Sequence, residues 1–226
     1  MKSIKISAAL AAVMVAGAAH AQMGWGDGKW MVGVGAQQIS PQVRSGALDA
    51  PSAPNTQVDI KSDTQPILWI TRMLDDHWSV ELPIAPAFKH DIVGDGAIAG
   101  VGKIGSVKAL PITVFGQYRF MEPNAKFRPY VQLGVTYAKQ FGARGSATLD
   151  ALNPINPIGG HTGLQVESKW ALTPGVGITI ALTDKYFADI QYTKTFLKTN
   201  TRLTTGQNIA TKLDPDAIRV GVGMRF

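Results

Sequence analysis

The chain has 226 residues, a formal charge of +6 at pH 7 and 45% hydrophobic residues, with 24 Gly, 13 Pro and no Cys. The lack of cysteine excludes a disulfide framework and a thiolate metal site, and a mild positive charge without a run of Lys or Arg argues against nucleic-acid binding. The Gly and Pro content favours strands and turns over helices.

Residues 1–21 have the features of a secretory signal. Lys2 and Lys5 precede an apolar run over 6–19, and Ala19-His20-Ala21 matches an A-x-A cleavage site. A retained helical anchor is the alternative, but the run is shorter than the roughly 20 residues that a spanning helix needs. We therefore predict a cleaved signal peptide over 1–21 and one exported domain over 22–226.

The remaining chain consists of segments in which apolar and polar side chains alternate, the pattern of strands with two different faces. Trp78, Val80 and Leu82, for example, lie opposite Ser79 and Glu81. Each segment is long enough to cross a bilayer at a tilt. The eight predicted strands are 29–39, 64–74, 78–84, 110–120, 127–137, 170–180, 186–192 and 218–226.

The connections between these strands alternate in length. Those over 75–77, 121–126 and 183–185 are short, and those over 40–63, 90–106, 142–165 and 198–212 are long. Outer-membrane barrels combine an even number of strands with short periplasmic turns and long outer loops. A secreted β-sandwich is the alternative fold, but it has no reason to segregate its loops in this way.

Aromatic residues lie near the strand ends on the apolar face, as in the two girdles of such barrels. They are Trp30, Trp78, Tyr118, Phe120, Phe127, Tyr137, Trp170, Tyr186 and Phe226. We predict an all-β fold, an eight-stranded antiparallel up-and-down transmembrane β-barrel, monomeric and located in the cell outer membrane.

Several segments, in matching order and spacing, resemble the OmpW family of outer-membrane proteins, which is related to AlkL-type channels for hydrophobic compounds. They include Val80-Glu81-Leu82, the segment 85–90, Phe127-Arg128-Pro129-Tyr130-Val131, Leu213-Asp214-Pro215 and the closing segment 221–226. The resemblance implies a barrel with a narrow apolar lumen and a lateral opening that passes small hydrophobic molecules. The Pro- and Ala-rich first loop and the long third loop depart from the family, so the substrate's identity does not carry over.

The predicted lumen has a charged part and an apolar part. Eight strands enclose an interior that side chains nearly fill, which excludes a wide aqueous pore. Buried charges must be paired or hydrated, so the inward charges predict a plug toward the periplasmic half; the simpler interpretation is that they only hold the barrel closed. These charged residues are Glu81, Arg119, Arg128, Glu167, Lys169, Asp189, Arg219 and Arg225.

Ile67, Trp69, Pro111 and Phe115 are inward but apolar, and we expect them to form a path for apolar solutes. Proline cannot donate to a β-ladder, so Pro66, Pro83 and Pro86 are candidates for a lateral opening through which such a solute would reach the lipid.

No catalytic residue, metal site or cofactor is predicted. The chain lacks a G-x-S-x-G elbow, a P-loop and the H-E-x-x-H spacing, although His90 with Ser106 or His161 with Ser168 could pair as in a lipid-modifying enzyme. Expected partners are small hydrophobic solutes, the barrel assembly machinery, which would read Phe226, and outer-membrane lipid. Lipopolysaccharide would pair with loop cations: Arg44, Lys61, Lys103, Arg144, Arg202 and Lys212.

The sequence therefore predicts a channel for passive transport of small hydrophobic molecules with lateral release. The alternative is a structural or stress-related barrel that displays its loops and transports nothing.

Overall fold

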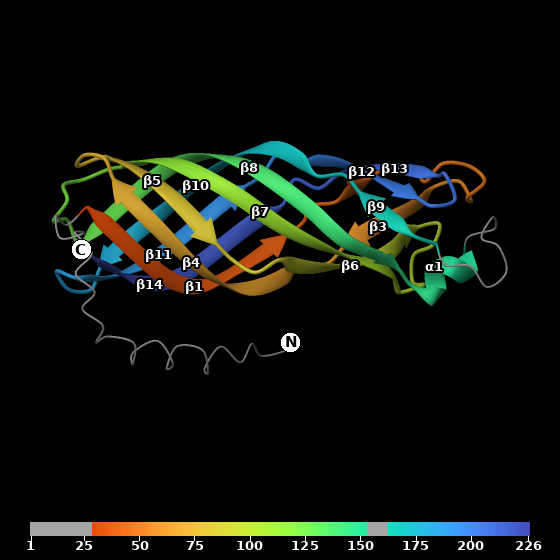
Figure 1. The fold of residues 1–226 in the computed structure, drawn as a ribbon, viewed down its shortest axis with the longest axis horizontal. Helices are drawn as coiled ribbons and strands as arrows, with labels where there is room; N and C mark the ends of the chain where they lie inside the picture. Colours follow the sequence, from red (N-terminus) through yellow and green to blue (C-terminus); the bar gives the residue numbers. More distant parts are fainter. Residues whose placement is uncertain (1–28, 153–161) are drawn as a thin grey trace.

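The computed structural model describes residues 29–152 and 162–226, so the predicted signal peptide lies outside the described residues. An elongated barrel occupies one part of the molecule and a strand-built extension the other (Figure 1). Eight strands form the barrel, of which the third is divided into β5 and β6. They are β1 (Trp30–Ser40), β4 (Asp63–Met73), β5 (Trp78–Ile84) with β6 (Phe88–Gly96), β7 (Lys103–Arg119), β8 (Phe127–Gly145), β10 (Lys169–Ala181), β11 (Tyr186–Lys194) and β14 (Asp216–Arg225).

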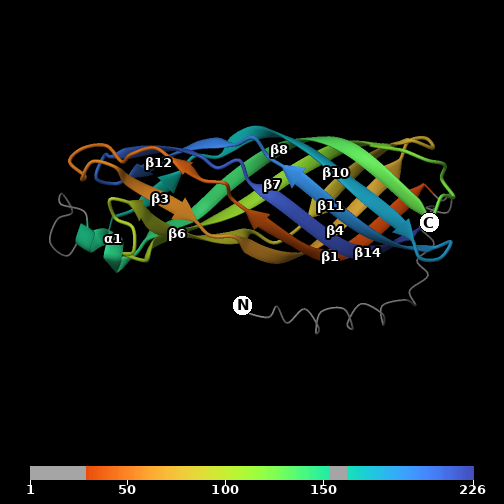
Figure 2. The ribbon, with the colours of Figure 1, turned by 180° about the vertical axis from the view of Figure 1, so that it is seen from behind.

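The ring closes through antiparallel pairs between all neighbours. β1 pairs with both β4 and β14, and the pairing continues through β11, β10 and β8 to β7, which pairs back to β5 and β6. Phe226 completes the seam, because its backbone exchanges two hydrogen bonds with Trp30. The view from behind shows the same tilted strands on the opposite wall (Figure 2). The predicted eight-stranded barrel is confirmed.

The alternation in the sequence becomes an apolar outer surface and a filled interior. On β8, Val131, Leu133 and Val135 are exposed, whereas Tyr130 and Thr136 are buried inside. Exposed rings border this surface at both ends: Trp78, Phe120, Phe127 and Tyr186 at one, Phe141, Trp170, Tyr192 and Phe196 at the other. Phe127 and Tyr137 are ten residues apart, which on a strand tilted by about 40° spans about 25 Å, the height of a barrel's apolar band.

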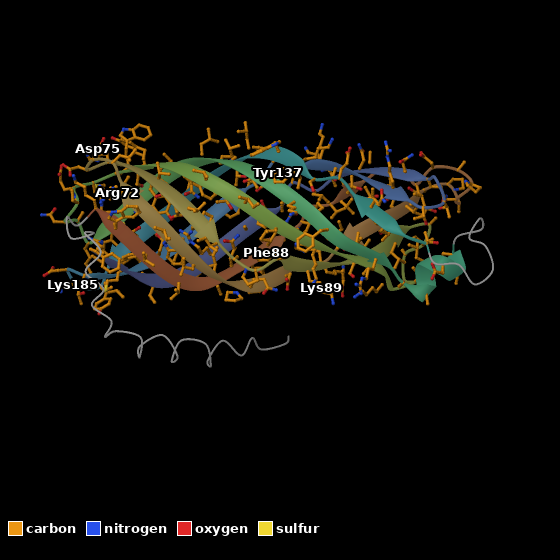
Figure 3. All side chains as sticks on the ribbon, in the orientation of Figure 1. Arg72, Asp75, Phe88, Lys89, Tyr137 and Lys185 are labelled. Carbon is orange, nitrogen blue, oxygen red and sulfur yellow. The ribbon has the colours of Figure 1, made fainter. Side chains whose placement is uncertain are left out.

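The three short turns lie together at the end of the barrel that holds the C-terminus, here called the turn end. Figure 3 places Asp75 and Lys185 at this end and Tyr137 near the middle of the molecule. In the first turn, the Trp78 and His77 N–H groups donate to Asp75 Oδ1 at 2.7 and 2.8 Å, which lowers the pKa of that carboxyl.

The extension corrects one expectation, since the segments predicted as long loops are largely folded. They contain β2 (Arg44–Ser45), β3 (Thr56–Ile60), β9 (Leu164–Val166), β12 (Lys198–Leu203), β13 (Asn208–Lys212) and α1 (Ala147–Leu152). β2, β13, β12 and β9 form a second sheet, and β3 joins β6. Pairing of these segments buries the apolar side chains of their inner faces around a cavity. In residues 29–152 and 162–226 no helix is long and apolar enough to cross a membrane.

Candidate functional site

An apolar cavity of about 100 Å³ lies in the barrel lumen. Ile67, Pro111 and Phe115, three of the four residues predicted for an apolar path, line this lumen cavity together with Phe88 and Ala138. Strands on several sides of the barrel contribute to the lining, so the cavity lies on the barrel axis and not in one wall.

A second and larger cavity, of about 360 Å³, lies inside the extension. Its lining is aliphatic and hydroxylated, with Ile92, Ile104, Leu149, Leu203 and Ile209 among its residues. Ile60, Val107, Gln140 and Leu213 line both cavities and are here called the junction. The two cavities are therefore adjacent, and both are predominantly apolar.

Threonine hydroxyls line the turn-end side of the lumen cavity. Thr113, Thr136, Thr173 and Thr195 form a chain of hydrogen bonds, with oxygen–oxygen distances of 2.8, 2.6 and 3.1 Å. These hydroxyls satisfy one another, so a solute in the cavity finds few free polar groups.

A layer of glutamines follows the threonines toward the turn end. Gln132 Oε1 accepts hydrogen bonds from Gln117 at 2.9 Å and from Gln191 at 3.1 Å, and all three side chains are buried. On β7 the inward residues Thr113, Gln117 and Arg119 occur in this order, so the polarity of the interior rises step by step toward the turn end.

Four buried charged residues form the last layer: Glu81, Arg119, Asp189 and Arg219, here called the charge cluster. Arg219 binds Glu81 through two hydrogen bonds of 2.7 and 3.1 Å and binds Asp189 at 3.0 Å. Arg119 donates to Ser79, Gln117 and Thr179. Both carboxylates are paired, the hydroxyl of Tyr130 donates to Asp189, and all four members of the cluster are buried and hydrogen-bonded.

Of the other predicted charges, Arg128 and Arg225 lie next to this cluster, whereas Glu167 and Lys169 do not. Arg128 and Arg225 line a hollow at the turn end, where Arg128 donates to the backbone carbonyl of Asp76. Glu167 and Lys169 are not in the barrel interior: they pair with each other at 3.0 Å, with side chains 46% and 43% exposed, at the other end. The expected plug position is wrong for these two residues because β10 begins at Lys169, next to the extension.

Trp69 also lies elsewhere than expected. It is fully buried among Met31, Ile67, Met73 and Phe187, under the guanidinium of Arg219 at 4.1 Å, and is not part of the cavity lining. The ring fits because its neighbours Gly33 and Gly221 have no side chain; a Cβ at either position would collide with it. Trp69 therefore supports the charge cluster.

The barrel wall is interrupted beside the lumen cavity. β5 pairs with β7 as far as Glu81 and Phe115, and pairing resumes only at Phe88 and Ala109 of β6 and β7. Between these points 82–87 and 110–114 face each other without ladder pairs; this interval is here called the wall gap. Pro83 and Pro86 lie in it, and Pro83, Ala85 and Pro111 line the lumen cavity.

Pro66 differs from the other two candidate prolines. It is opposite Ala36 in the continuous ladder between β1 and β4, and the pairing of β4 with β5 ends two residues away, at Leu68. Pro66 therefore borders the interrupted region from the β4 side without breaking its own ladder with β1.

One histidine lines the lumen cavity next to the extension. His90 pairs with Val107, five residues beyond the level of Tyr137 on the neighbouring strand, and its Nδ1 is 2.8 Å from the Lys61 carbonyl. Burial lowers its pKa below the usual value, which the Lys61 hydrogen bond and the nearby Asp63 offset in part. Ser106 pairs instead with Asp91, so no His–Ser pair forms here. In the described part of the chain, no three His, Cys, Asp or Glu residues gather as a metal site would require.

The threonine chain and the glutamine layer are the parts of the site that sequence reasoning did not single out. The alternation does place Thr113, Gln117, Gln132 and Gln191 on inward faces, but only the cross-strand register shows that their side chains meet.

Comparison with known proteins agrees with this geometry. The model of the OmpW family matches residues 26–226. Outer membrane protein W of Vibrio cholerae is 26% identical over 204 residues, covering 88% of this chain and 89% of the relative. Outer membrane protein W of Salmonella typhi is 30% identical over 174 residues, with coverages of 74% and 76%.

Two solved structures share the fold. The crystal structure of OprG from Pseudomonas aeruginosa has a TM-score of 0.77 at 23% identity and covers 88% of this chain and 95% of its own. AlkL, solved in lipid bilayers, has a TM-score of 0.64 at 19% identity, with coverages of 92% and 95%. The turn end is then periplasmic and the extension lies outside the cell. The chain is an outer-membrane β-barrel and belongs to the OmpW family.

Proposed function

We propose that this protein is a channel through which small hydrophobic molecules pass passively from outside the cell into the outer membrane, leaving sideways through the barrel wall. The observation that carries the proposal is the lumen cavity, which is apolar, adjoins an apolar cavity in the extension and is closed toward the turn end by the threonine chain, the glutamine layer and, beyond them, the charge cluster. A molecule entering from outside meets apolar surface as far as Thr113 and Thr136, and then buried polar groups.

The direction of exit follows from comparing the free-energy costs of the two routes, toward the periplasm and through the wall. Each Å² of apolar surface moved out of water is stabilised by roughly 25 cal/mol, so the two cavities favour an apolar solute. Passage toward the periplasm would require opening the ion pairs of Arg219 with Glu81 and Asp189, and breaking a buried pair costs about 3–5 kcal/mol. The wall gap offers an exit without that cost.

Pro83 and Pro86 support the gap as an exit, because neither has an N–H to donate to β7 and the ladder cannot close at their positions. Pro66 lies on β4, on the other side of the segment 82–87, and would help to keep that segment unpaired with β4. The proposed path therefore uses Ile67, Pro111 and Phe115, while Trp69 and the charge cluster form its closed floor.

The alternative is a barrel without transport, held closed by its polar interior and displaying the extension to the surroundings. The charge cluster fits this alternative equally well. The two apolar cavities do not, because a purely structural barrel has no need of apolar space along its axis.

Phe226 belongs to a separate proposal. Its backbone is already paired to Trp30 in the folded barrel, and its position as an aromatic C-terminal residue fits recognition by the barrel assembly machinery before folding. The closed ring of ladders needs no second copy of the chain, which fits a monomer.

The test is uptake of radiolabelled n-alkanes of graded length into liposomes, with and without the purified barrel. We expect the barrel to accelerate uptake of short alkanes and to lose the effect as length increases, while a sugar of similar mass stays excluded. Equal uptake with and without the barrel across the series would favour the structural alternative.

A further inference from the structure

The second sheet of the extension carries a row of cations on its outer face. Lys198 of β12 is directly opposite Lys212 of β13, and Lys212 is directly opposite Arg44 of β2. Residues opposite each other in a ladder share a face of the sheet. Their neighbours along the strands, Thr199 and Thr211, lie on the inner face and line the cavity inside the extension. The three cations therefore point away from the protein interior.

A shallow hollow lies over this row. Arg44, Lys169, Lys198 and Lys212 line it together with Thr199, Asn200, Ala210 and Thr211, and no carboxylate is part of the lining. Like charges directly opposite in a sheet destabilise it, so this row is unfavourable by itself. An anion in the hollow would reverse that effect.

Only two of the four cations have an ionic partner. Lys212 pairs with Asp214 at 2.8 Å, and Lys169 pairs with Glu167 at 3.0 Å. Within 29–152 and 162–226, no carboxylate lies within ion-pair distance of Arg44 or Lys198. Both residues are exposed to solvent. Two cations are thus available to a ligand.

The position of the hollow along the bilayer normal indicates which ligand it binds. Lys169 adjoins Trp170, which is 71% exposed and belongs to the outer aromatic ring of the barrel. Phe196 bridges to Leu172 on the apolar surface, and Lys198 follows two residues later, about 5 Å farther from the bilayer centre on a strand tilted by about 40°. Side chains one or two residues beyond an aromatic girdle lie at the level of the lipid headgroups.

We infer that this hollow, here called the basic hollow, binds a phosphate group of lipopolysaccharide in the outer leaflet. Arg44 would bind two phosphate oxygens through its planar guanidinium, and Lys198 would act as a point charge beside it. This inference depends on the outer-membrane location and is independent of the proposed transport.

The test compares binding of lipid A with binding of its enzymatically dephosphorylated form to the detergent-purified barrel, by native mass spectrometry. The informative variant is Arg44→Gln/Lys198→Gln. Its matched control is Lys126→Gln/Lys185→Gln, which removes the same charge at the periplasmic turns. Arg44→Lys/Lys198→Arg keeps the charge, and folding of all variants is checked by circular dichroism.

We expect the parent and the periplasmic control to bind phosphorylated lipid A preferentially. The Arg44→Gln/Lys198→Gln variant should lose about twentyfold in affinity, and the charge-conserving variant should retain most of it. Equal binding of the dephosphorylated lipid by the parent, or unchanged binding by the neutralised variant, would overturn the inference. So would competition by millimolar inorganic phosphate, which would indicate a site for free anions.

Discussion

Arg219 of β14 binds Glu81 of β5 across the barrel lumen, with Nη1 2.7 Å from Oε1, although 138 residues separate them in the sequence. The same guanidinium binds Asp189 of β11 and lies on the ring of Trp69 of β4. One side chain thus connects four strands of the barrel, on the turn-end side of the glutamine layer.

Replacing Arg219 should therefore be costly. Arg219→Gln leaves two buried carboxylates without their cation, and we expect a loss of about 3–5 kcal/mol in the free energy of unfolding. The measurement is urea unfolding of the barrel in lipid vesicles, followed by tryptophan fluorescence. Lys169→Gln is the control, because its exposed pair with Glu167 should contribute less than about 1 kcal/mol. Similar losses in both variants would show that the charge cluster is not a structural centre.

Except at the start of β10, where Glu167 and Lys169 lie outside the barrel interior, the sequence predicts which residues face inward but not which of them meet. Period-two alternation is a local property, so Glu81, Asp189 and Arg219 could be assigned to the interior from their neighbours alone. Their pairing depends on the register of strands that are distant in the sequence. Position along the barrel axis is equally hidden: Trp69 faces inward as predicted but lies at the level of the charge cluster, below the cavity.

The extension was missed for a different reason. In β12 the inner face carries Thr199, Thr201 and Leu203, so its alternation is polar on both sides and is typical of a loop. Such strands become ordered through pairing with β13 and β9 over a shared apolar cavity, which is a tertiary effect.

The wall gap can be tested by bridging it. Ile84 and Ile112 lie on its two sides, and both side chains are about half exposed on the lipid-facing surface. Because the chain has no cysteine, Ile84→Cys/Ile112→Cys can be linked selectively with a short bis-maleimide. We expect crosslinking to reduce alkane uptake at least about tenfold, because it would close the proposed exit.

The matched control links β1 to β14 through Val34→Cys/Val222→Cys, two residues opposite each other in a continuous ladder. Crosslinking there should leave uptake unchanged. If both links have no effect while the parent barrel still accelerates uptake, solutes leave by another route and lateral release through this gap is wrong.

Filling the lumen cavity should block the path without unfolding the barrel. Ala138 is buried in the cavity lining, and a phenylalanine there would occupy much of the 100 Å³ available. We expect Ala138→Phe to lower alkane uptake about tenfold, with some loss of stability from overpacking. Ala188→Phe adds the same ring on the lipid-facing side of β11 and should not change uptake. Equal uptake by both variants would place the path outside this cavity.

His90 makes the order of the extension dependent on pH. Burial lowers its pKa in the folded state, so the folded protein binds a proton less readily than the unfolded chain. By linkage, stability is unaffected well above pH 6.5 and falls as the pH drops below it toward the folded-state pKa. The carboxylate of Asp63 limits this loss by favouring the protonated ring.

Hydrogen–deuterium exchange at pH 7.5 and 5.5, corrected for the intrinsic rates, should show amides of β6 and the neighbouring part of β7 losing protection at the lower pH. His90→Gln keeps a side chain that can hydrogen-bond but cannot titrate in this range, so its protection should be the same at both pH values. Protection that falls equally in the parent and in His90→Gln would assign the pH dependence to the carboxylates of the extension, because those are the groups that both proteins share.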